Sequence, residues 1–580
     1  MISRETITET LEKIALLLEL KGENPFKVRA YRTGAEIVAT FAGDFVQKAK
    51  DNDLSDTKGI GKALAEKLHE LATSGKLGYY EKLRSEFPDT IFELFDIPGL
   101  GPKKIKALYD KLNITSVTAL EQACQSDEIT RLPGFGAKSC SKILEAIAFR
   151  SQHADQFRFG DIAETAEEIL LALKSQPGTI EASLAGSYRR GKEVLHDLDF
   201  LVSTEAPETV MSFFIGMPEV STVSLHGSTK STVILASGLQ CDLRAVSAEQ
   251  YPFALNYFTG SREHNITMRS KALKLGYTLN EYRLTPLEGK KQQPLPCTNI
   301  TTEEDLYAAL SMDFIPPSLR ENTGEVEAAE QDALPKLVTL EDLQGTFHNH
   351  TTASDGRSSL QEMATAARDL GLDYLGISDH SQSSFQANGL DSERLLKQGV
   401  EIRKLNEGFA GKFRLFAGVE CDILKDGSLD YPDDILSQLD YVVASVHNAF
   451  TLPENEMTTR IIRAVENPHV TMIGHLTGRL LLTRKPYAVD VTRVIDACAS
   501  NHTAIEINAN PKRLDMDWRW WKHARDKGVK CAINPDAHHT SQLHYLKYGV
   551  NIARKGWLRT EDIINCLPLE AVTEFLNIKS

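Results

Sequence analysis

The sequence predicts a multidomain protein of mixed α+β and α/β class, and three patterns support this prediction. Residues 1–150 repeat a Gly-apolar-Gly segment between helical stretches, which indicates a helical N-terminal region. Around residue 197, acidic and apolar residues alternate as in a half-buried strand. Beyond residue 340, short apolar runs that end in polar residues are separated by helical patterns, which predicts a βα-type barrel.

The length of the chain agrees with several domains. At 580 residues there is room for about four compact units, at one domain per ~150 residues. We expect boundaries between six segments: 1–85, 86–152, 153–248, 249–316, 317–338 and 339–580. The segment 317–338 is polar and has little apolar periodicity, so we expect an interdomain linker there.

Charge and composition narrow the class of protein. The net charge of −15 excludes nucleic-acid binding by bulk attraction, so local clusters and backbone donors would have to carry it. No apolar run approaches the ~18 residues of a membrane span and no signal peptide is recognisable, so we expect a cytoplasmic protein without membrane contacts. The eight cysteines occur singly and are expected to be reduced, mostly core residues.

The segment from Gly186 to Val202 joins a tight turn to paired carboxylates. Asp197 and Asp199 lie two apart in an apolar run, so strand periodicity places both on one face. Crowded carboxylates repel unless a cation lies between them, and Mg²⁺ is usually held by one or two carboxylates plus substrate phosphates. Asp242, alone on another apolar run, would complete a two-metal site for phosphoryl transfer. The alternative is an acidic surface strand.

The turn before these carboxylates is a candidate phosphate site. Gly186 and Ser187 would offer backbone N–H groups to phosphate oxygens. Arg190 adds a planar cation that is always charged. Together with the carboxylates, these groups predict a site that holds a metal-bound phosphate ester.

Three Gly-apolar-Gly segments in the N-terminal third each join two helical patterns. They resemble helix-hairpin-helix motifs, whose N–H groups at the start of the second helix bind DNA phosphates without reading sequence. The alternative is simple capping of helix pairs by glycine. The glycines in question are Gly59, Gly61, Gly99, Gly101, Gly134 and Gly136.

The first of these segments also resembles the lyase segment of DNA polymerase beta. In that family a lysine at the position of Lys67 forms a Schiff base with an abasic sugar, which requires a neutral amine. Lys27 and Tyr31 occupy plausible supporting positions, but a second family lysine is replaced by Ala63. An exposed helix lysine near phosphate is the alternative interpretation of Lys67.

The run from residue 257 to 269, with the segment 186–200, is similar to family X DNA polymerases. The resemblance implies an 8-kDa-like domain over 1–85, a fingers-like domain over 86–152, a nucleotidyltransferase palm over 153–248 and a thumb over 249–316. It implies Mg²⁺ or Mn²⁺ at the carboxylates and templated addition of deoxynucleotides. It also implies that Tyr257, Phe258 and Gly260 shape the sugar pocket. It further implies that Asn265 contacts the incoming nucleotide and that Arg269 contacts the template minor groove.

The apolar runs of the C-terminal half end at, or are followed by, residues of types that can bind metal. The set contains nine nitrogen or oxygen ligands and no thiolate, which is too many for one ion and suits two or three Zn²⁺ or Mn²⁺ ions. A single strand-end histidine is more often a hydrogen-bonded core residue, but six successive strand ends favour a metal site. The candidates are His348, His350, Asp355, His380, Glu420, His447, His475, Asp536 and His538.

The order of these ligands resembles the PHP domain, which the resemblance extends over residues 339–580 as a distorted (β/α)₇ barrel. Members of that family hydrolyse phosphoesters, so the resemblance implies a 3′–5′ exonuclease, with AP endonuclease as a further activity. Arg479 and Arg513 are expected either to bind phosphate or to be ordinary surface arginines. We expect Asp379 to support a neighbouring imidazole, and His539 to lie outside the ligand set.

The leading interpretation is a bifunctional repair enzyme that fills short gaps in DNA and trims 3′ ends. Its expected partners are gapped or primed DNA and dNTPs, and the protein is expected to be a monomer. Two alternatives are a phosphatase of small metabolites fused to a vestigial nucleotidyltransferase, and a non-catalytic DNA-binding scaffold. Intact carboxylates and hairpins disfavour the first, and the filled metal sites disfavour the second.

Overall fold

The computed structural model describes residues 4–41, 45–54, 57, 59–97, 100–126 and 128–577. It divides into two compact units, Met1–Ala154 and Asp155–Ser580. The predicted fold class is confirmed, because a helical N-terminal unit precedes a mixed sheet and a seven-stranded parallel sheet. The six-segment division of the chain stays a prediction. No helix in the described part of the chain is long and apolar enough to cross a membrane.

The N-terminal unit is built from helices around one apolar core. Helices α1 and α2 pack against each other, and buried side chains such as Leu11, Leu68, Ile105 and Phe135 form the core. Its elements are α1 (Arg4–Lys21), α2 (Pro25–Thr40), α3 (Phe45–Lys50), α4 (Lys62–Ser74), α5 (Gly78–Arg84), η1 (Asp89–Asp96), α6 (Pro102–Leu112), α7 (Val117–Gln125), η2 (Glu128–Arg131) and α8 (Ala137–Ser151).

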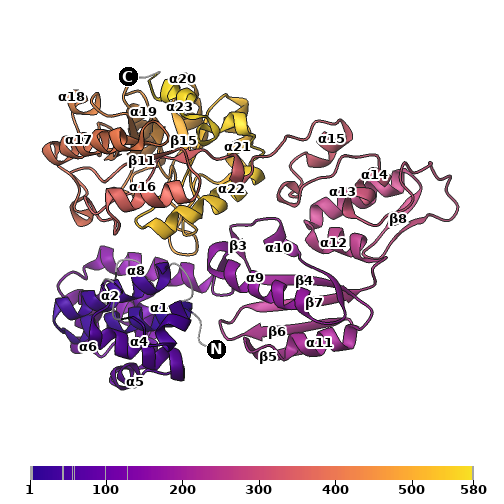
Figure 1. Ribbon diagram of the computed structural model, residues 1–580, viewed down its shortest axis with the longest axis horizontal. Coiled ribbons are helices and arrows are strands. Elements are labelled where there is room, and N and C mark those ends of the chain that lie inside the picture. The colour runs from indigo at the N-terminus through magenta and orange to yellow at the C-terminus, as the bar shows by residue number, and fades with distance from the viewer. Residues whose placement is uncertain are drawn as a thin grey trace. The chain divides into compact units, whose positions relative to one another are not determined.

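The second unit begins with a five-stranded sheet, which we call the middle sheet, in the order β2-β4-β7-β6-β5. Strands β4 and β7 pair in parallel, and the other neighbours are antiparallel. Helices α9 and α11 pack against β2 and β6 (Figure 1). The elements of this region are β1 (Phe157–Arg158), α9 (Phe159–Ser175), β2 (Thr179–Leu184), α10 (Gly186–Arg189), β3 (Val194–Leu195), β4 (Asp197–Thr204), α11 (Pro207–Ile215), β5 (Val220–His226), β6 (Lys230–Leu235) and β7 (Gln240–Val246).

Alternation along β4 fixes which face of the middle sheet carries the acids. Leu198, Phe200 and Val202 are buried in the core beneath α9 and α11. Because successive side chains of a strand point to opposite faces, Asp197 and Asp199 lie on the other face. The period-two pattern of the sequence therefore places the two carboxylates on the same face, away from the core.

A helical subdomain follows the middle sheet. The segment 317–338, which we expected to be a linker, contributes Leu319, Val326, Ala329 and Leu337 to the buried core of this subdomain. The buried Arg320 guanidinium there pairs with Glu303 at 2.7 Å. The elements are α12 (Tyr251–Thr259), α13 (Arg262–Lys274), β8 (Tyr277–Leu279), β9 (Leu284–Pro286), α14 (Glu303–Ala309), η3 (Pro317–Leu319) and α15 (Glu325–Glu330).

The seven parallel strands of the C-terminal region follow one another in chain order, from β10 to β16. A parallel bridge between Asn349 and Ala537 joins the two ends of the sheet, so we call this region the barrel. Helices α16, α17 and α22 pack on β11, β12 and β16 (Figure 1). The strands are β10 (Gly345–Thr346), β11 (Tyr374–Ile377), β12 (Arg414–Asp422), β13 (Tyr441–Ser445), β14 (Met472–Ile473), β15 (Ala504–Asn508) and β16 (Cys531–Asn534).

The helices of the barrel lie between its strands in the chain, as in the predicted βα alternation. The interior is filled by a separate cluster of large side chains that includes Phe347, Tyr374, Phe416 and Tyr441. The barrel is therefore a packed core with polar residues left at one end. The helices are η4 (Leu340–Asp342), α16 (Leu360–Asp369), η5 (Phe385–Ala387), α17 (Ser392–Phe409), α18 (Asp433–Leu436), α19 (Glu454–Val465), α20 (Val491–Ser500), η6 (Trp518–Trp520), α21 (Trp521–Asp526), η7 (Thr540–Tyr545), α22 (Leu546–Lys555), η8 (Thr560–Asp562), η9 (Ile564–Cys566) and α23 (Leu569–Asn577).

Candidate active sites

The three acids of the middle sheet come together on two adjacent strands. In the parallel register of β4 and β7, Asp199 lies opposite Asp242 and Asp197 lies opposite Gln240. We call Asp197, Asp199 and Asp242 the carboxylate triad. Burial, followed by the charges of the other two acids, raises the pKa of Asp199 to about 7. Burial and the charge of Asp242 also raise the pKa of Asp197. The crowding that we inferred from the sequence is therefore present, and it favours bound protons or bound cations.

Two residues that sequence reasoning missed hold Asp242. Thr232 Oγ1 donates a hydrogen bond to Asp242 Oδ1 at 2.5 Å, and Lys230 Nζ lies 3.4 Å from Asp242 Oδ2. Both residues lie on β6, which pairs with β7 and places Thr232 opposite Asp242. Only the strand pairing reveals them, because nothing in their own sequence segment marks them as polar neighbours of an acid.

Gly186 packs directly against the triad. Its φ is +57°, and a Cβ atom at this position would lie 2.0 Å from Asp199 Oδ2 and 3.0 Å from Asp199 Cγ. The Ala185 N–H donates to the Asp199 carbonyl at 2.8 Å, which fixes the turn against β4. Ser187, the next residue of α10, is half-exposed. The structure thus requires glycine where the sequence suggested a phosphate-binding turn.

Arg190 is buried and bonded within the protein. Its Nε donates to Glu321 at 3.0 Å, and one terminal nitrogen donates to the Thr259 carbonyl. A Cβ atom on Gly260, whose φ is +71°, would lie 3.1 Å from Arg190 Nη1. The structure therefore places the guanidinium between the middle sheet and the helical subdomain, and its role toward phosphate stays a prediction.

The aromatic pair of the helical subdomain connects to β7. The rings of Tyr257 and Phe258 lie 5.2 Å apart in an edge-on arrangement, and the Arg244 guanidinium carbon is 4.4 Å from the centre of the Phe258 ring. Asn265 Nδ2 donates to the Tyr257 carbonyl at 2.7 Å, and Arg269 Nε donates to the Asn265 carbonyl at 3.3 Å. These contacts bring the predicted nucleotide-contacting residues together on α12 and α13.

The second glycines of the three N-terminal segments occupy equivalent positions. Gly61, Gly101 and Gly136 are the N-cap residues of α4, α6 and α8, and their helices have no side-chain hydrogen bond to the cap. Because the first-turn N–H groups of a helix lack partners within the helix, such ends suit phosphate oxygens. This arrangement repeats three times in one unit.

The first glycine of each Gly-apolar-Gly segment precedes the N-cap glycine by two residues. Gly59 and Gly134 have φ values of +90° and +85°, which favour glycine. Gly99, the corresponding residue of the second segment, lies outside the described residues.

Lys67 lies on α4 beside an aromatic ring. Its Nζ donates to the Ala63 carbonyl at 3.0 Å and lies 5.3 Å from the centre of the Tyr79 ring. Lys27 Nζ lies 5.6 Å from the same ring, and Tyr31 stacks on that ring at 5.9 Å. The three residues singled out from the sequence thus gather around Tyr79, which the sequence did not indicate.

All nine predicted ligands of the barrel converge at one end of the strands, and we call them the barrel cluster. Glu420 lies at its centre: His475 Nε2 and His447 Nε2 are 3.0 and 3.1 Å from its Oε1, and His380 Nδ1 is 2.8 Å from its Oε2. His348 Nε2 also lies 3.3 Å from Glu420 Oε1. One carboxylate is therefore shared by several imidazoles.

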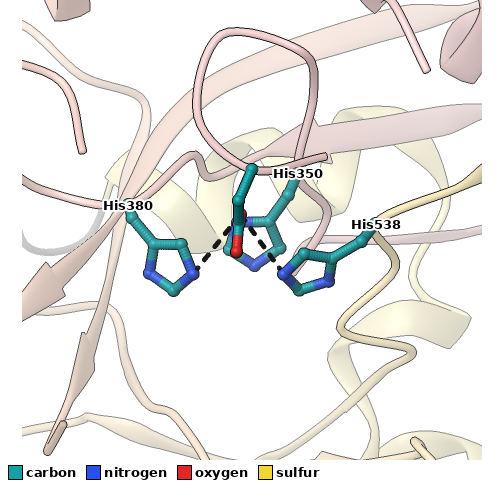
Figure 2. A group of neighbouring side chains, drawn as sticks. His350, His380 and His538 are labelled. Atoms are coloured by element: carbon teal, nitrogen blue, oxygen red, sulfur yellow. Dashed lines mark ion pairs between the residues drawn. The ribbon is translucent and has the colours of Figure 1, made fainter. Parts of the chain in front are cut away.

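The remaining ligands lie beside this centre. His350 Nε2 is 3.2 Å from Asp536 Oδ1. Asp355 Oδ1 lies 3.7 Å from His380 Nε2 and 3.4 Å from His538 Nε2. Figure 2 shows the rings of His350, His380 and His538 turned toward a common point. Among the described residues, three overlapping groups could each hold an ion: His350, Asp355, His380 and His538; His348, His350 and Asp536; and His380, Glu420 and His447.

The donor atoms of the barrel cluster fit metal ions. His350 Nδ1 and His475 Nδ1 are buried and make neither a hydrogen bond nor an ion pair with the described residues. A buried nitrogen without a partner is costly, and two of them among ligand-type side chains indicate a bound ion. Imidazole and carboxylate ligands without thiolate suit Zn²⁺ or Mn²⁺.

The cluster shifts the pKa values of its members in opposite directions: burial lowers the pKa of His447, but neighbouring carboxylates outweigh burial and raise this pKa to about 10, whereas the pKa values of other members are lowered. Burial by itself raises the pKa of Glu420, but the imidazoles of His447 and His348 outweigh it and hold this pKa well below its usual range. Burial and the neighbouring rings of His538 and His380 lower the pKa of His350 to about 4. His350 is therefore a neutral ligand near pH 7, as metal binding requires.

Two acids behind the cluster were missed by sequence reasoning. Glu506 Oε1 lies 2.6 Å from His348 Nδ1, and its Oε2 accepts the His475 N–H at 2.7 Å. Asp422 contacts His447 Nδ1 through a short hydrogen bond. Both lie on barrel strands, and Asp422 comes two residues after the predicted ligand Glu420, so the alternation along β12 was the available signal for it. Such partners orient ligating imidazoles and fix their tautomers.

The structure corrects one expectation and refines another. Asp379 was expected to support an imidazole, which is wrong: its oxygens accept hydrogen bonds from Thr351, Ser354 and Gln398. Arg479 is neither on the surface nor free, since it bonds to Asp517 at 2.6 Å. Arg513 Nε lies 3.4 Å from Asp536 Oδ2, beside the cluster.

Comparison with known proteins assigns families to four parts of the chain. Residues 3–77 match a helix-hairpin-helix domain, and residues 91–148 match a SAM-like helix-hairpin-helix tandem. Residues 254–321 match the DNA polymerase beta thumb, and residues 346–510 match the PHP domain.

Individual relatives cover all or part of the chain. A protein of Bacillus subtilis (strain 168) named DNA polymerase/3′-5′ exonuclease PolX is 39% identical over 575 residues, which is 99% of both chains. A probable phosphatase of Thermoanaerobacter sp. (strain X514) is 29% identical over 249 residues, 40% of this chain and 94% of its own length. A probable phosphatase of Caldicellulosiruptor saccharolyticus is 28% identical over 245 residues, 41% of this chain and 97% of its own length.

Proposed function

Because the chain belongs to the family X DNA polymerases that carry a C-terminal PHP domain, we propose that the carboxylate triad and the barrel cluster are its two active sites. The protein is a DNA polymerase with a 3′–5′ exonuclease in its PHP domain. The register that sets Asp199 opposite Asp242 carries the polymerase assignment, since it places three acids on two adjacent strands, as a two-metal site would require. The finer proposal is that the enzyme fills short gaps during DNA repair.

The roles of the polymerase residues follow from their positions. Mg²⁺ or Mn²⁺ bound at the triad would lower the pKa of the primer 3′-hydroxyl and neutralise the triphosphate. Asp197 and Asp199 would hold both ions and Asp242 one of them, with Lys230 and Thr232 orienting Asp242. The N–H groups of the turn at Gly186 and Ser187 would position the phosphates.

The residues of α12 and α13 would select the nucleotide. Tyr257, Phe258 and Gly260 would form the sugar pocket and would exclude a ribose 2′-hydroxyl; the packing of the two rings and the tight position of Gly260 support this role. Asn265 would contact the incoming dNTP and Arg269 the template minor groove. Their mutual hydrogen bonds support this assignment, because they hold the residues in one group.

The barrel cluster would hold two or three Zn²⁺ or Mn²⁺ ions and hydrolyse the 3′-terminal phosphodiester of DNA. Bound ions would supply an activated water and neutralise the phosphate. Glu506 and Asp422 would keep the imidazoles of His348 and His447 in the ligating tautomer. AP endonuclease activity at the same cluster is a further part of this proposal.

The hairpins of the N-terminal unit would bind the DNA backbone through the helix ends at Gly61, Gly101 and Gly136, with Gly59 and Gly134 shaping the turns. Phosphate binding by backbone N–H groups explains how a chain with a net charge of −15 holds DNA. A cytoplasmic monomer that binds gapped or primed DNA and dNTPs remains our proposal. The gathering of Lys27, Tyr31 and Lys67 around Tyr79 supports a deoxyribose phosphate lyase in the same unit.

A one-nucleotide-gap substrate with Mg²⁺ or Mn²⁺, with and without dNTPs, tests both assignments. Asp242→Ala should reduce extension by about 10³-fold or more and leave 3′ shortening intact, because the two sites share no ligand. His350→Ala should have the opposite effect, so each variant is the control for the other. Loss of both reactions in Asp242→Ala would contradict two independent sites.

A second candidate function is hydrolysis of small phosphomonoesters by the barrel. It is favoured by the two probable phosphatases that match about two fifths of this chain along nearly their whole length. Phosphate release from a small phosphomonoester, without shortening of any DNA strand, would support this candidate. The same result would refute the exonuclease.

A further inference from the structure

The barrel cluster has a buried centre and a partly exposed rim. His348, His350 and Glu420 are buried, whereas the side chains of Asp355 and His538 are 36% and 28% exposed. The side chain of His447 is 22% exposed. A substrate phosphate must therefore approach over this exposed rim, and residues beside the rim can contact the nucleotides on either side of that phosphate.

A loop that follows a cluster ligand borders this rim. It runs from His380 to Leu390, and its ends are joined by the Leu390 N–H, which donates to the His380 carbonyl at 2.8 Å. Ser383 Oγ donates to Asp422 at 2.5 Å, and Ser384 Oγ lies 3.3 Å from the same carboxylate. Asp422 in turn contacts His447, so the loop is fixed to the rim through a residue that orients a ligand.

The far side of the loop is fixed as well. Asn388 Nδ2 donates to the Ala353 carbonyl at 3.1 Å, two residues before the ligand Asp355. Arg394 Nη1 donates to the Gly389 carbonyl at 3.0 Å, and its other terminal nitrogen donates to the Ala353 carbonyl. The loop is thus pinned beside His447 at one end and beside Asp355 at the other.

At the tip of this pinned loop stands Phe385, the first residue of η5. It is 87% exposed, more than the other large exposed apolar side chains of the described residues, and it is absent from the apolar core of the barrel. The ring therefore does little for the stability of the fold. A planar apolar ring on a loop that is pinned at both ends beside the barrel cluster has the properties of a platform for a nucleobase, since every base offers a flat face for stacking.

We propose that Phe385 stacks on a nucleobase of the strand that the barrel cluster degrades, and so selects nucleic acid over smaller phosphoesters. This inference rests on the proposed exonuclease function. Stacking positions the scissile phosphate over the rim without reading the identity of the base. Phe385 would be a positioning residue, since it contacts the substrate base and not the reacting phosphate.

The test measures kcat/KM for release of 3′ nucleotides from a single-stranded oligonucleotide by the full chain with Mn²⁺ and without dNTPs. Phe385→Ala should lower it by about 5- to 100-fold, the range that base stacking on an aromatic side chain supplies. Phe385→Trp keeps a ring and should stay within about 2-fold of the unmodified protein. Val400→Ala, which truncates another exposed apolar residue of the barrel that is 58% exposed, is the control and should change nothing.

Oligonucleotides that lack one base separate stacking from a structural role. A series of oligonucleotides carries a single abasic residue at each of the last few 3′ positions in turn. At one of these positions, the abasic residue should lower the kcat/KM of the unmodified protein as much as Phe385→Ala lowers it on the complete strand. With that oligonucleotide, Phe385→Ala should show no further loss. An equal loss on every substrate, or none on the complete strand, would overturn the proposal. If the unmodified protein shortened no strand at all, the exonuclease assignment itself would fail.

Discussion

Replacing Gly186 by alanine should disable the polymerase site through a single misplaced carboxylate. The new Cβ atom would lie 2.0 Å from Asp199 Oδ2, and real Cβ contacts do not fall below 3.0 Å, so the oxygen must move by at least 1.0 Å. Rotation of the carboxylate alone does not relieve the clash, because Asp199 Cγ and Cβ are also only 3.0 and 3.2 Å away. A displacement of about 1 Å in a catalytic group can reduce a rate about 10²-fold.

The matched control is Gly238→Ala in the same sheet. Gly238 has a φ of +85°, and a Cβ atom there would meet nothing within 4 Å. Both variants therefore carry the conformational cost of alanine at positive φ, about 1–2 kcal/mol, but only one has the clash. Single-nucleotide insertion into a gap should fall about 100-fold in Gly186→Ala and at most a few-fold in Gly238→Ala, with 3′ shortening unchanged in both. Similar insertion rates for the two variants would refute the role of this contact.

Three more predictions concern protons, DNA and the lyase. The pKa of Asp199 is raised to about 7, so this carboxyl is protonated at lower pH and a cation must displace the proton. The Mn²⁺ concentration that half-saturates gap filling should therefore fall as the pH rises from 6 to 7 and should level off above pH 7. A half-saturating concentration that does not change with pH would contradict this. Gly136→Asp should stabilise α8 by only about 0.3 kcal/mol as an N-cap, so thermal unfolding should barely change. It should weaken binding to duplex DNA in fluorescence anisotropy, and tighter DNA binding would exclude a phosphate site there. Borohydride should trap a covalent adduct between the protein and an abasic substrate. Lys67→Ala should form no adduct, whereas the control Lys82→Ala on α5 should still form it. An adduct that persists in Lys67→Ala would show that Lys67 is not the Schiff-base nucleophile.

Short-range patterns were sufficient to predict the positions of the acids. Period two along β4 puts Asp197 and Asp199 on one face, and this needs no knowledge of the rest of the sheet. The neighbours that hold Asp242 come from β6, and their contact depends on the register between two strands. A single sequence carries no direct signal for that register, so Lys230 and Thr232 could not be found.

The barrel shows the same division between local and long-range information. Strand-end residues were visible because each apolar run stops at a polar residue. Glu506 lies inside β15, which is buried along its whole length, so an acid there looks like an isolated exception. Asp422 ends β12, two residues after Glu420, and its contact with His447 depends on the pairing of β12 with β13. The irregular spacing of the apolar residues in 317–338 gave no helical signal, yet Leu319 and Val326 lie in the core of the helical subdomain.

Shared ligands in the barrel cluster make metal loading collective. His350 and His380 each belong to two of the three ligand groups, so an ion that leaves one group changes the coordination available in the next. Without ions, the histidines and carboxylates already pair with one another, which gives the empty cluster a stable arrangement that competes with partial refilling. A chelator would then empty the cluster over a narrow concentration range, while gap filling continues with Mg²⁺ at separate ligands. The supply of transition metal in the cell would thereby set the balance between synthesis and removal of DNA ends.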